Sequence, residues 1–385
     1  MTTNILAHTQ KLLPEIKQWR RYIHQNAELS FEETMTQEKI CQVLDSKGIE
    51  YVKVAVTGVL AKLKGKQPNR PIILRADMDA LPINEQTGLD YACTKGVMHA
   101  CGHDIHSAAL LGALVALKEI GHENEVWGLF QPGEELHPGG ASMVIAEGVF
   151  DEVEPIFVGQ HCSPELNTGT IGIRAGQFMA STDEIHITVN GRGGHGAMPH
   201  KSADAVLACS AMIMAMQQIS ARCADPLTPT VLSFGKVIAD GATNILPDSV
   251  LVEGTFRTMN NQWRDDALAR IEQIAISSTA AYGCTAEVDI KRGYPSVINT
   301  PELTEKVYRI ATDMMGDQGT VQTIPMRMTA EDFGFYAEKY PACFVRLGVG
   351  NGNENEPALH TSKFNPNEDS LAYGAAFLAA VASNL

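Results

Sequence analysis

Short apolar strands that end in charged or metal-ligating residues are the feature that most restricts the fold of this chain. Three apolar segments, 71–74, 125–130 and 155–160, have the length of buried strands, and helical patterns separate them. The residues that follow them are, in order, Asp77 and Asp79, Glu134 and Glu135, and His161. Ligands gather at the carboxyl ends of the strands in open α/β sheets. The pattern therefore predicts a mostly parallel, three-layer α/β domain with a site at this edge.

A nine-residue stretch between the first two strands is the densest group of ligand-type side chains. Residues 98–106 read Met-His-Ala-Cys-Gly-His-Asp-Ile-His. Gly102 permits a tight backbone that aims Cys101 and His103 at one point. A helix is expected over 107–120, and we expect Asp104 to accept from the free N–H groups of its first turn. A structural zinc site would show a second Cys/His pair at similar spacing, and the chain has none, so further ligands must come from distant segments.

Composition narrows the class of protein. A length of 385 residues with 44% hydrophobic content predicts two or three domains. The net charge of −15 argues against nucleic-acid and anionic membrane partners, which require a basic face. The N-terminus lacks the pattern of a signal peptide, and apolar runs such as 108–117 are too short to span a membrane. Because the eight cysteines are scattered without a disulfide framework, we expect a cytoplasmic protein.

The order of predicted elements changes near Gly176. From 183 to 291 it reads strand, helix, strand, strand, helix, strand, which is the order of a ferredoxin-like sandwich. The Met-rich helix in this region is expected to pack against a sheet or a partner helix. We predict a catalytic domain of residues 1–180 and 295–385, with an inserted α+β domain of residues 181–294.

Residues far apart in the chain could complete a metal site. The candidate ligands are Cys101, His103, Glu135, His161 and His360. Five ligands are too many for one tetrahedral ion with an open position, but they suit two ions that share a bridge. Such a pair lowers the pKa of a water between the ions and polarises a carbonyl oxygen. Glu134, next to a ligand but not one itself, is the candidate proton acceptor and donor. The alternative for Glu134 and Glu135 is a solvated acidic turn.

Six motifs together resemble the metal-dependent amidohydrolase group within the aminoacylase and carboxypeptidase superfamily. That group contains hippurate hydrolases, auxin-conjugate hydrolases and N-acetyl-diaminopimelate deacetylases. The motifs are RADMDALP at 75–82, MHACGHD at 98–104, FQPGEE at 130–135, GRGGHGAMPH at 191–200, TNILPD at 243–248 and LH at 359–360. The resemblance implies a zinc-peptidase-like catalytic domain with a dinuclear metal site. It also implies an inserted lid domain through which the chain forms a homodimer, with a homotetramer left open. The thiolate and imidazoles favour zinc or nickel, and glutamate and histidine also accept manganese or cobalt, so the identity of the metal stays open.

The resemblance also implies a role for each ligand. Cys101 would bridge the two ions. His103 and His161 would complete one site, Glu135 and His360 the other, with Glu134 acting as general base and then acid. The wider superfamily has a metal-binding histidine where this chain has Asp77. His103 would take over that ligation and Asp79 would orient it, which leaves the role of Asp77 unpredicted.

Three residues of the inserted domain are candidates for contact with substrate. The resemblance implies that His195 reaches a neighbouring active site and stabilises the oxyanion of the tetrahedral intermediate. Asn244 and Arg257 are candidates for holding the free carboxylate of the substrate, for which the arginine fork is suited. The alternatives are a loop histidine and an arginine that are merely solvated.

The predicted function is hydrolysis of the amide bond of N-acyl amino acids, of the hippurate or N-acetyl type, to a carboxylic acid and a free amino acid. A dipeptidase or carboxypeptidase with the same two-metal chemistry is the nearest alternative. A non-catalytic, metal-dependent binding protein is a second, but it would have no need for Glu134 or His195. Redox chemistry at Cys101 is disfavoured, because the chain has no Cys-X-X-Cys pair.

Overall fold

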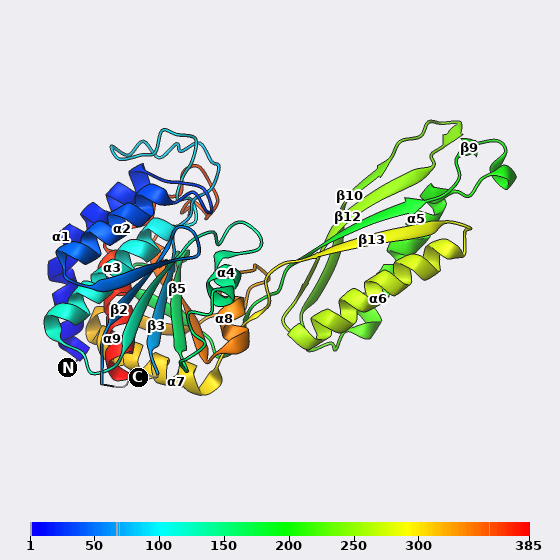
Figure 1. The fold of residues 1–385 in the computed structure, drawn as a ribbon. Helices are drawn as coiled ribbons and strands as arrows, with labels where there is room; N and C mark the ends of the chain where they lie inside the picture. The colour runs from blue at the N-terminus through cyan, green and yellow to red at the C-terminus, as the bar shows by residue number, and fades with distance from the viewer. Residues whose placement is uncertain (1, 67, 69, 354) are drawn as a thin grey trace. The chain divides into compact units, whose positions relative to one another are not determined.

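The chain forms two compact units, each built on its own sheet (Figure 1). The computed structural model describes residues 2–66, 68, 70–353 and 355–385. Unit 1 comprises Met1–Phe178, Ile298–Met326 and Phe335–Leu385, and unit 2 comprises Met179–Val297 and Arg327–Gly334. The chain leaves unit 1 at β7 (Gly176–Met179) and returns to it at β14 (Val297–Asn299). The short segment Arg327–Gly334 then belongs to unit 2 as well.

Unit 1 contains an eight-stranded mixed sheet in the order β1-β2-β4-β3-β5-β16-β6-β15. The four central strands, β4, β3, β5 and β16, run parallel to one another, whereas β1 and β2 form an antiparallel edge. Parallel central strands place their carboxyl ends along one edge of the sheet. The strands are β1 Glu50–Val54, β2 Gly58–Leu63, β3 Ile72–Asp77, β4 Val126–Gln131, β5 Ile156–Asn167, β6 Thr170–Ile173, β15 Thr320–Thr323 and β16 Ala342–Gly350.

Helices cover both faces of this sheet, with α1, α3 and α9 on one side and α4 and α8 on the other (Figure 1). The side chains of β3 alternate accordingly: Ile72, Leu74 and Ala76 enter the core under α1, α3 and α9, whereas Arg75 bonds to Gln131, which also accepts from Tyr336 of α8. The helices are α1 Thr2–Gln25, α2 Thr34–Ser46, α3 His103–Ile120, α4 Gly140–Ala146, α7 Pro301–Met315, α8 Gly334–Lys339 and α9 Ser370–Asn384. The predicted three-layer α/β fold is confirmed.

Unit 2 is a four-stranded antiparallel sheet in the order β10-β12-β8-β13 with α5 and α6 packed on one face. In chain order the elements are β8 Asp183–Asn190, α5 Ala205–Met216, β10 Thr230–Ala239, β12 Ser249–Thr258, α6 Asn261–Ala280 and β13 Thr285–Arg292. This is the predicted ferredoxin-like arrangement. Ile185, Ile187 and Val189 are buried under the helices, and the residues between them lie on the open face.

One segment of the described chain, Ala205–Cys223, is apolar and long enough to cross a membrane by length and composition alone. Its helix α5 packs one face on the sheet of unit 2, where Ala208, Met212 and Met216 are fully buried. The apolar character of α5 therefore serves, at least on that face, the core of unit 2.

Candidate active site

The five predicted metal ligands all lie in unit 1, and their donor atoms meet above the sheet edge. Cys101 Sγ lies 3.2 Å from His161 Nε2 and 3.3 Å from His360 Nε2. Glu135 Oε1 lies 3.3 Å from His360 Nε2 and 4.0 Å from His103 Nε2. The donor atoms form two groups, Cys101 with His103 and His161, and Cys101 with Glu135 and His360, and within each group all lie within 4.8 Å of one another. The thiol of Cys101 is common to both groups.

Local backbone geometry makes this convergence possible. Gly102 has a φ of 89°, and a Cβ at that position would lie 2.8 Å from Cys162 Sγ. Only glycine fits there, so the turn can direct Cys101 and the first residue of α3, His103, to one point. His161 lies inside β5, which continues to Asn167, and not at the end of a strand as the sequence indicated. His360 adopts a positive φ of 62° in the turn before α9.

Hydrogen bonds leave two histidines with their Nε2 atoms facing the cluster. His103 Nδ1 donates to Asp79 Oδ1 at 3.1 Å, and His161 Nδ1 donates to the carbonyl of Cys162 at 2.8 Å. Such partners fix the tautomer and the orientation of a metal-binding imidazole. His103 Nε2 and Glu135 Oε1 are buried and make no hydrogen bond within the described residues. Buried donor atoms left without hydrogen bonds are typical of atoms that ligate cations.

The electrostatics of the cluster also favour cations. Burial alone would lower the pKa of His103, but the carboxylates of Asp77, Asp79 and Glu135 outweigh it and raise the pKa to about 10. Burial and the neighbouring carboxylates of Glu135 and Glu134 raise the pKa of the Cys101 thiol well above its ordinary value. Excess negative charge therefore surrounds the donor atoms, and divalent ions could replace the protons that it attracts.

Asp77, whose role could not be predicted, joins the end of β3 to α3 and to the middle of β5. Its Oδ2 accepts from Arg75 Nη1 at 2.6 Å and its Oδ1 from His106 Nδ1 at 2.5 Å. His106 Nε2 accepts in turn from the backbone N–H of Cys162 at 2.8 Å. Burial opposes ionisation of Asp77, but His103, Arg75 and His106 hold its pKa well below the ordinary value. The carboxylate therefore ties β3 to α3 and, through His106, to the part of β5 that carries His161.

Glu134 is buried, and one of its carboxylate oxygens lies within 4.8 Å of the donor atoms of His103 and Glu135. The turn that carries it begins at Gly133, with a positive φ of 59°. Asp79 Oδ2 accepts the N–H of Glu135 at 2.9 Å. The turn therefore presents Glu134 and Glu135 to the same region, which side chains on a regular strand could not do.

The three candidate substrate contacts lie in unit 2, and the fold brings two of them together. His195, in β9 (Gly194–His195), pairs with Ile245 of β11 (Ile245–Leu246), and the N–H of Gly196 donates to the carbonyl of Asn244 at 2.8 Å. His195 is exposed, and its Nδ1 accepts from the N–H of Ala197 at 3.1 Å. This contact leaves the proton of a neutral ring on Nε2.

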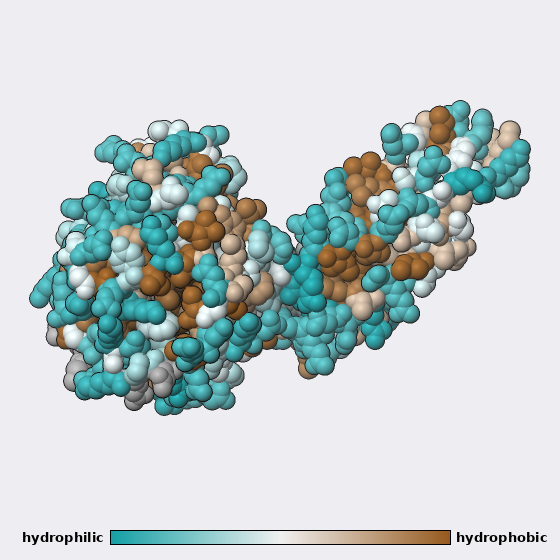
Figure 2. All heavy atoms as spheres, in the orientation of Figure 1, coloured by the Kyte–Doolittle hydropathy of each residue, from teal (hydrophilic) through white to brown (hydrophobic). Residues whose placement is uncertain are grey.

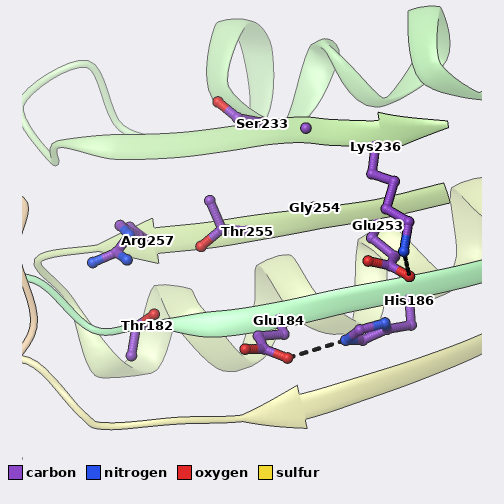
Figure 3. Close-up of a pocket in the computed structure, with 10 residues that line it drawn as sticks. Thr182, Glu184, His186, Ser233, Lys236, Glu253, Gly254, Thr255 and Arg257 are labelled. Carbon is purple, nitrogen blue, oxygen red and sulfur yellow. Dashed lines mark hydrogen bonds and ion pairs between the residues drawn. The ribbon is translucent and has the colours of Figure 1, made fainter. Parts of the chain in front are cut away.

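Arg257 lies apart from this pair, near the end of β12. It lines a shallow cavity on the open face of the unit 2 sheet, together with Thr182, Ser233 and Thr255 (Figure 3). Its Nη1 donates to the carbonyl of Met328 at 3.1 Å, and burial lowers the pKa of the guanidinium. Farther along the same face, Glu184 bonds to His186 and Lys236 to Glu253.

The prediction that Asp104 caps the N-terminus of α3 is wrong. Gly102, not a side chain, occupies the N-cap position, and Asp104 instead accepts from Arg20 Nε at 2.6 Å and from His24 Nδ1 at 2.8 Å. All three side chains are buried. The sequence offered one signal of this contact, because Arg20 falls on the apolar stripe of α1 beside Ile16 and Ile23, where a charge requires a partner.

Comparison with known proteins gives matches over most of the chain. A family model described as peptidase family M20/M25/M40 matches residues 73–384. The chain is 38% identical over 349 residues to the N-acetyl-L-cysteine deacetylase of Bacillus subtilis, covering 88% of this chain and 82% of that protein. It is 36% identical over 365 residues to the N-acetyldiaminopimelate deacetylase of Bacillus cytotoxicus, covering 94% and 95%. The crystal structure of the YXEP protein of Bacillus subtilis, described as a dinuclear metal binding peptidase, matches with a TM-score of 0.84 at 32% identity, covering 97% of this chain and 98% of that one.

Proposed function

This chain belongs to peptidase family M20/M25/M40, and from that membership we propose that it hydrolyses the amide bond of N-acyl amino acids with two divalent metal ions. The observation that carries the proposal is the buried thiol of Cys101, which is common to two groups of potential ligands. The products are a carboxylic acid and a free amino acid. Two relatives that match along most of the chain are named as deacetylases, so N-acetyl amino acids are the first substrates to test, before hippurate.

The two ligand groups support one assignment of residues to ions. His103 and His161 would hold one ion, Glu135 and His360 would hold the other, and Cys101 would be shared by both. When bound, such a pair of ions lowers the pKa of a water and polarises the carbonyl of the scissile amide. The thiol and imidazoles favour zinc or nickel, while the carboxylate and imidazoles also accept manganese or cobalt.

Proton transfer falls to Glu134, which lies beside the donor atoms of His103 and Glu135 without being needed as a ligand. Its carboxylate takes a proton from the attacking water and returns it to the leaving nitrogen, as one non-ligating carboxylate can do in turn. His195 donates from Nε2 to the oxyanion, because its Nδ1 is already occupied as an acceptor. Asn244 and Arg257 remain the candidates for the free carboxylate of the substrate. Because they lie at opposite ends of β12 in one copy, Asn244 would come with His195 from a partner copy.

The test of this mechanism compares two adjacent carboxylates. Glu134→Gln keeps the shape of the side chain but removes its basicity, so turnover should fall about 10²- to 10⁴-fold or more while metal content stays at the wild-type level. Glu135→Gln removes a proposed ligand and should lower both turnover and metal content. Metal analysis of protein purified without chelator, with assays on N-acetyl amino acids, hippurate and dipeptides, measures these effects. Retained turnover in Glu134→Gln would remove Glu134 from the mechanism, and turnover of dipeptides alone would favour the dipeptidase alternative.

We also propose that unit 2 is a lid that joins two copies of the chain. The outer face of α5 exposes Leu207 and Met214, and the edge strand β10 exposes Val237 and Ile238. Apolar patches are visible on this unit in Figure 2. An edge strand beside an apolar helix face favours a second copy as the occupant, since it can extend the sheet and cover the helix together.

The proposed location is the cytoplasm, because all eight cysteines are free thiols.

A further inference from the structure

The segment Glu28–Glu33 adjoins the catalytic cluster but supplies none of its ligands. It connects α1 to α2 and runs beside the end of β3, where the N–H of Ala80 donates to the carbonyl of Glu28 at 2.9 Å. Leu29 and Ala80 also form an isolated parallel bridge. The segment is therefore held against the same sheet edge that carries Asp77 and Asp79.

Two side chains of this segment hold the turn that carries Glu134. Glu33 Oε1 accepts the backbone N–H of Gly133 at 2.8 Å. Ser30 Oγ donates to Asp79 Oδ2 at 2.7 Å, and that same oxygen accepts the N–H of Glu135 at 2.9 Å. The N–H groups on both sides of Glu134 are thus bound, one by Glu33 directly and one by the Asp79 carboxylate that Ser30 orients.

The fit between this segment and the turn is close. Phe31 adopts a positive φ of 66°. Its ring packs so closely on Gly133 that a Cβ at that position would lie 2.3 Å from the ring atoms. Glu33 is fully buried, and its Oε2 accepts from Thr57 Oγ1 at 2.5 Å. Burial raises the pKa of Glu33 to about 7, against the opposing effect of the Thr57 bond. The buried carboxyl is therefore held by two hydrogen bonds, one of which ends on the turn that carries Glu134.

We propose that Glu33 and Ser30 are positioning residues that fix the carboxylate of Glu134 for proton transfer by holding the N–H groups of Gly133 and, through Asp79, Glu135. The inference rests on the proposed function, because it assigns Glu134 the proton transfer. Neither residue is among the candidate metal ligands or the candidate substrate contacts. Their effect should therefore appear in kcat, with KM and metal content preserved, since a small displacement of a catalytic group slows chemistry more than it weakens binding.

The test uses the metal-loaded enzyme and an N-acetyl amino acid that the wild type hydrolyses. Glu33→Ala should lower kcat about 10- to 100-fold at unchanged KM and metal content, the usual loss when an outer partner of a site is removed. Glu33→Gln should restore most of kcat, because its amide oxygen can still accept from Gly133 and its NH₂ can donate to Thr57. Glu32→Ala, at an exposed neighbouring position, is the matched control and should behave as the wild type.

A second variant keeps the inference testable if Glu33→Ala does not fold. Ser30→Ala removes one hydroxyl without changing the backbone, and it should lower kcat severalfold at unchanged KM. Wild-type kcat in both Glu33→Ala and Ser30→Ala, or in Ser30→Ala alone where Glu33→Ala is unfolded, would overturn the inference. If Glu134→Gln abolishes turnover in the same assay, such a result refutes the positioning role alone. If Glu134→Gln is active, the proposed function itself fails.

Discussion

The buried carboxylates of unit 1 are paired with donor groups of the protein. Asp77 lies between Arg75 and His106, Asp79 accepts from three groups, and Glu33 accepts from two. The difference between them lies in the partners. Asp77 meets positive charge, so its pKa falls, whereas Glu33 meets only neutral donors, so burial raises its pKa to about 7.

Glu33 should make stability depend on pH in a defined window. Its folded pKa exceeds the ordinary value of 4.5, so the folded protein holds this proton more tightly than the unfolded chain. Stability is therefore lost as the pH rises from about 4.5 through 7. Glu33→Gln lacks this titration and should gain up to about 3 kcal/mol relative to the wild type across the window, with no further gain above it. Urea unfolding of both proteins in the same buffers measures the difference, and a constant difference from pH 4.5 to 8 would contradict it.

At the scale of elements, the first helix is joined to the helix of the site by a buried ionic contact. Arg20 of α1 bonds to Asp104 in the first turn of α3, and its Nη1 donates to Tyr91 at 2.8 Å. His24 bridges Asp104 and Glu85 through its two ring nitrogens. Burial alone would lower the pKa of His24, but these two carboxylates raise it. Because Asp104 follows His103 directly, α1 helps to hold the start of α3 in register with the metal cluster.

Two adjacent arginines of α1 provide a controlled test of this contact. Arg20→Ala leaves Asp104 as a buried charge without its main partner and should destabilise the protein by about 3–5 kcal/mol. Arg21, whose side chain is 49% exposed, pairs with Glu368 at the surface, so Arg21→Ala should cost less than about 1 kcal/mol. Unfolding by guanidinium chloride compares the two variants. Equal losses would show that the buried pair contributes no more than the exposed one.

At the scale of the whole molecule, the proposed homodimer predicts that variants which become monomers also lose activity. Leu207 is 53% exposed on α5, and Leu207→Asp should place a charge in the interface and shift the protein to monomers in analytical ultracentrifugation. If His195 acts on the active site of the partner copy, turnover should fall in parallel. Val52→Asp changes a residue of unit 1 that is 48% exposed and should leave both mass and turnover unchanged. A wild-type protein that sediments as a monomer would refute the proposed interface.

Local patterns in the sequence sufficed to predict the fold and to group the candidate metal ligands. Alternation of apolar strands and helices predicts a layered α/β unit, and the βαββαβ order predicts the architecture of unit 2. The geometry of parallel strands brings their carboxyl ends to one edge, which is why Glu135, in the turn after β4, could be grouped with the other candidates before its position was known. His161 was grouped for the same reason, although it lies inside β5. His360 was placed with them by its residue type and by the LH motif.

The tertiary structure alone decided which partners the buried polar groups have. Asp104 is the expected cap of α3 by local rules, but Arg20, 84 residues away in the chain, takes its carboxylate. Glu33 accepts from Gly133 across 100 residues, and Asp77 accepts from His106 across 29 residues. Secondary-structure preferences act within a few residues, whereas desolvation forces each buried polar atom to bond to whatever group the packed layers bring beside it. For that reason the elements could be predicted from the chain, and the network that positions the site could not.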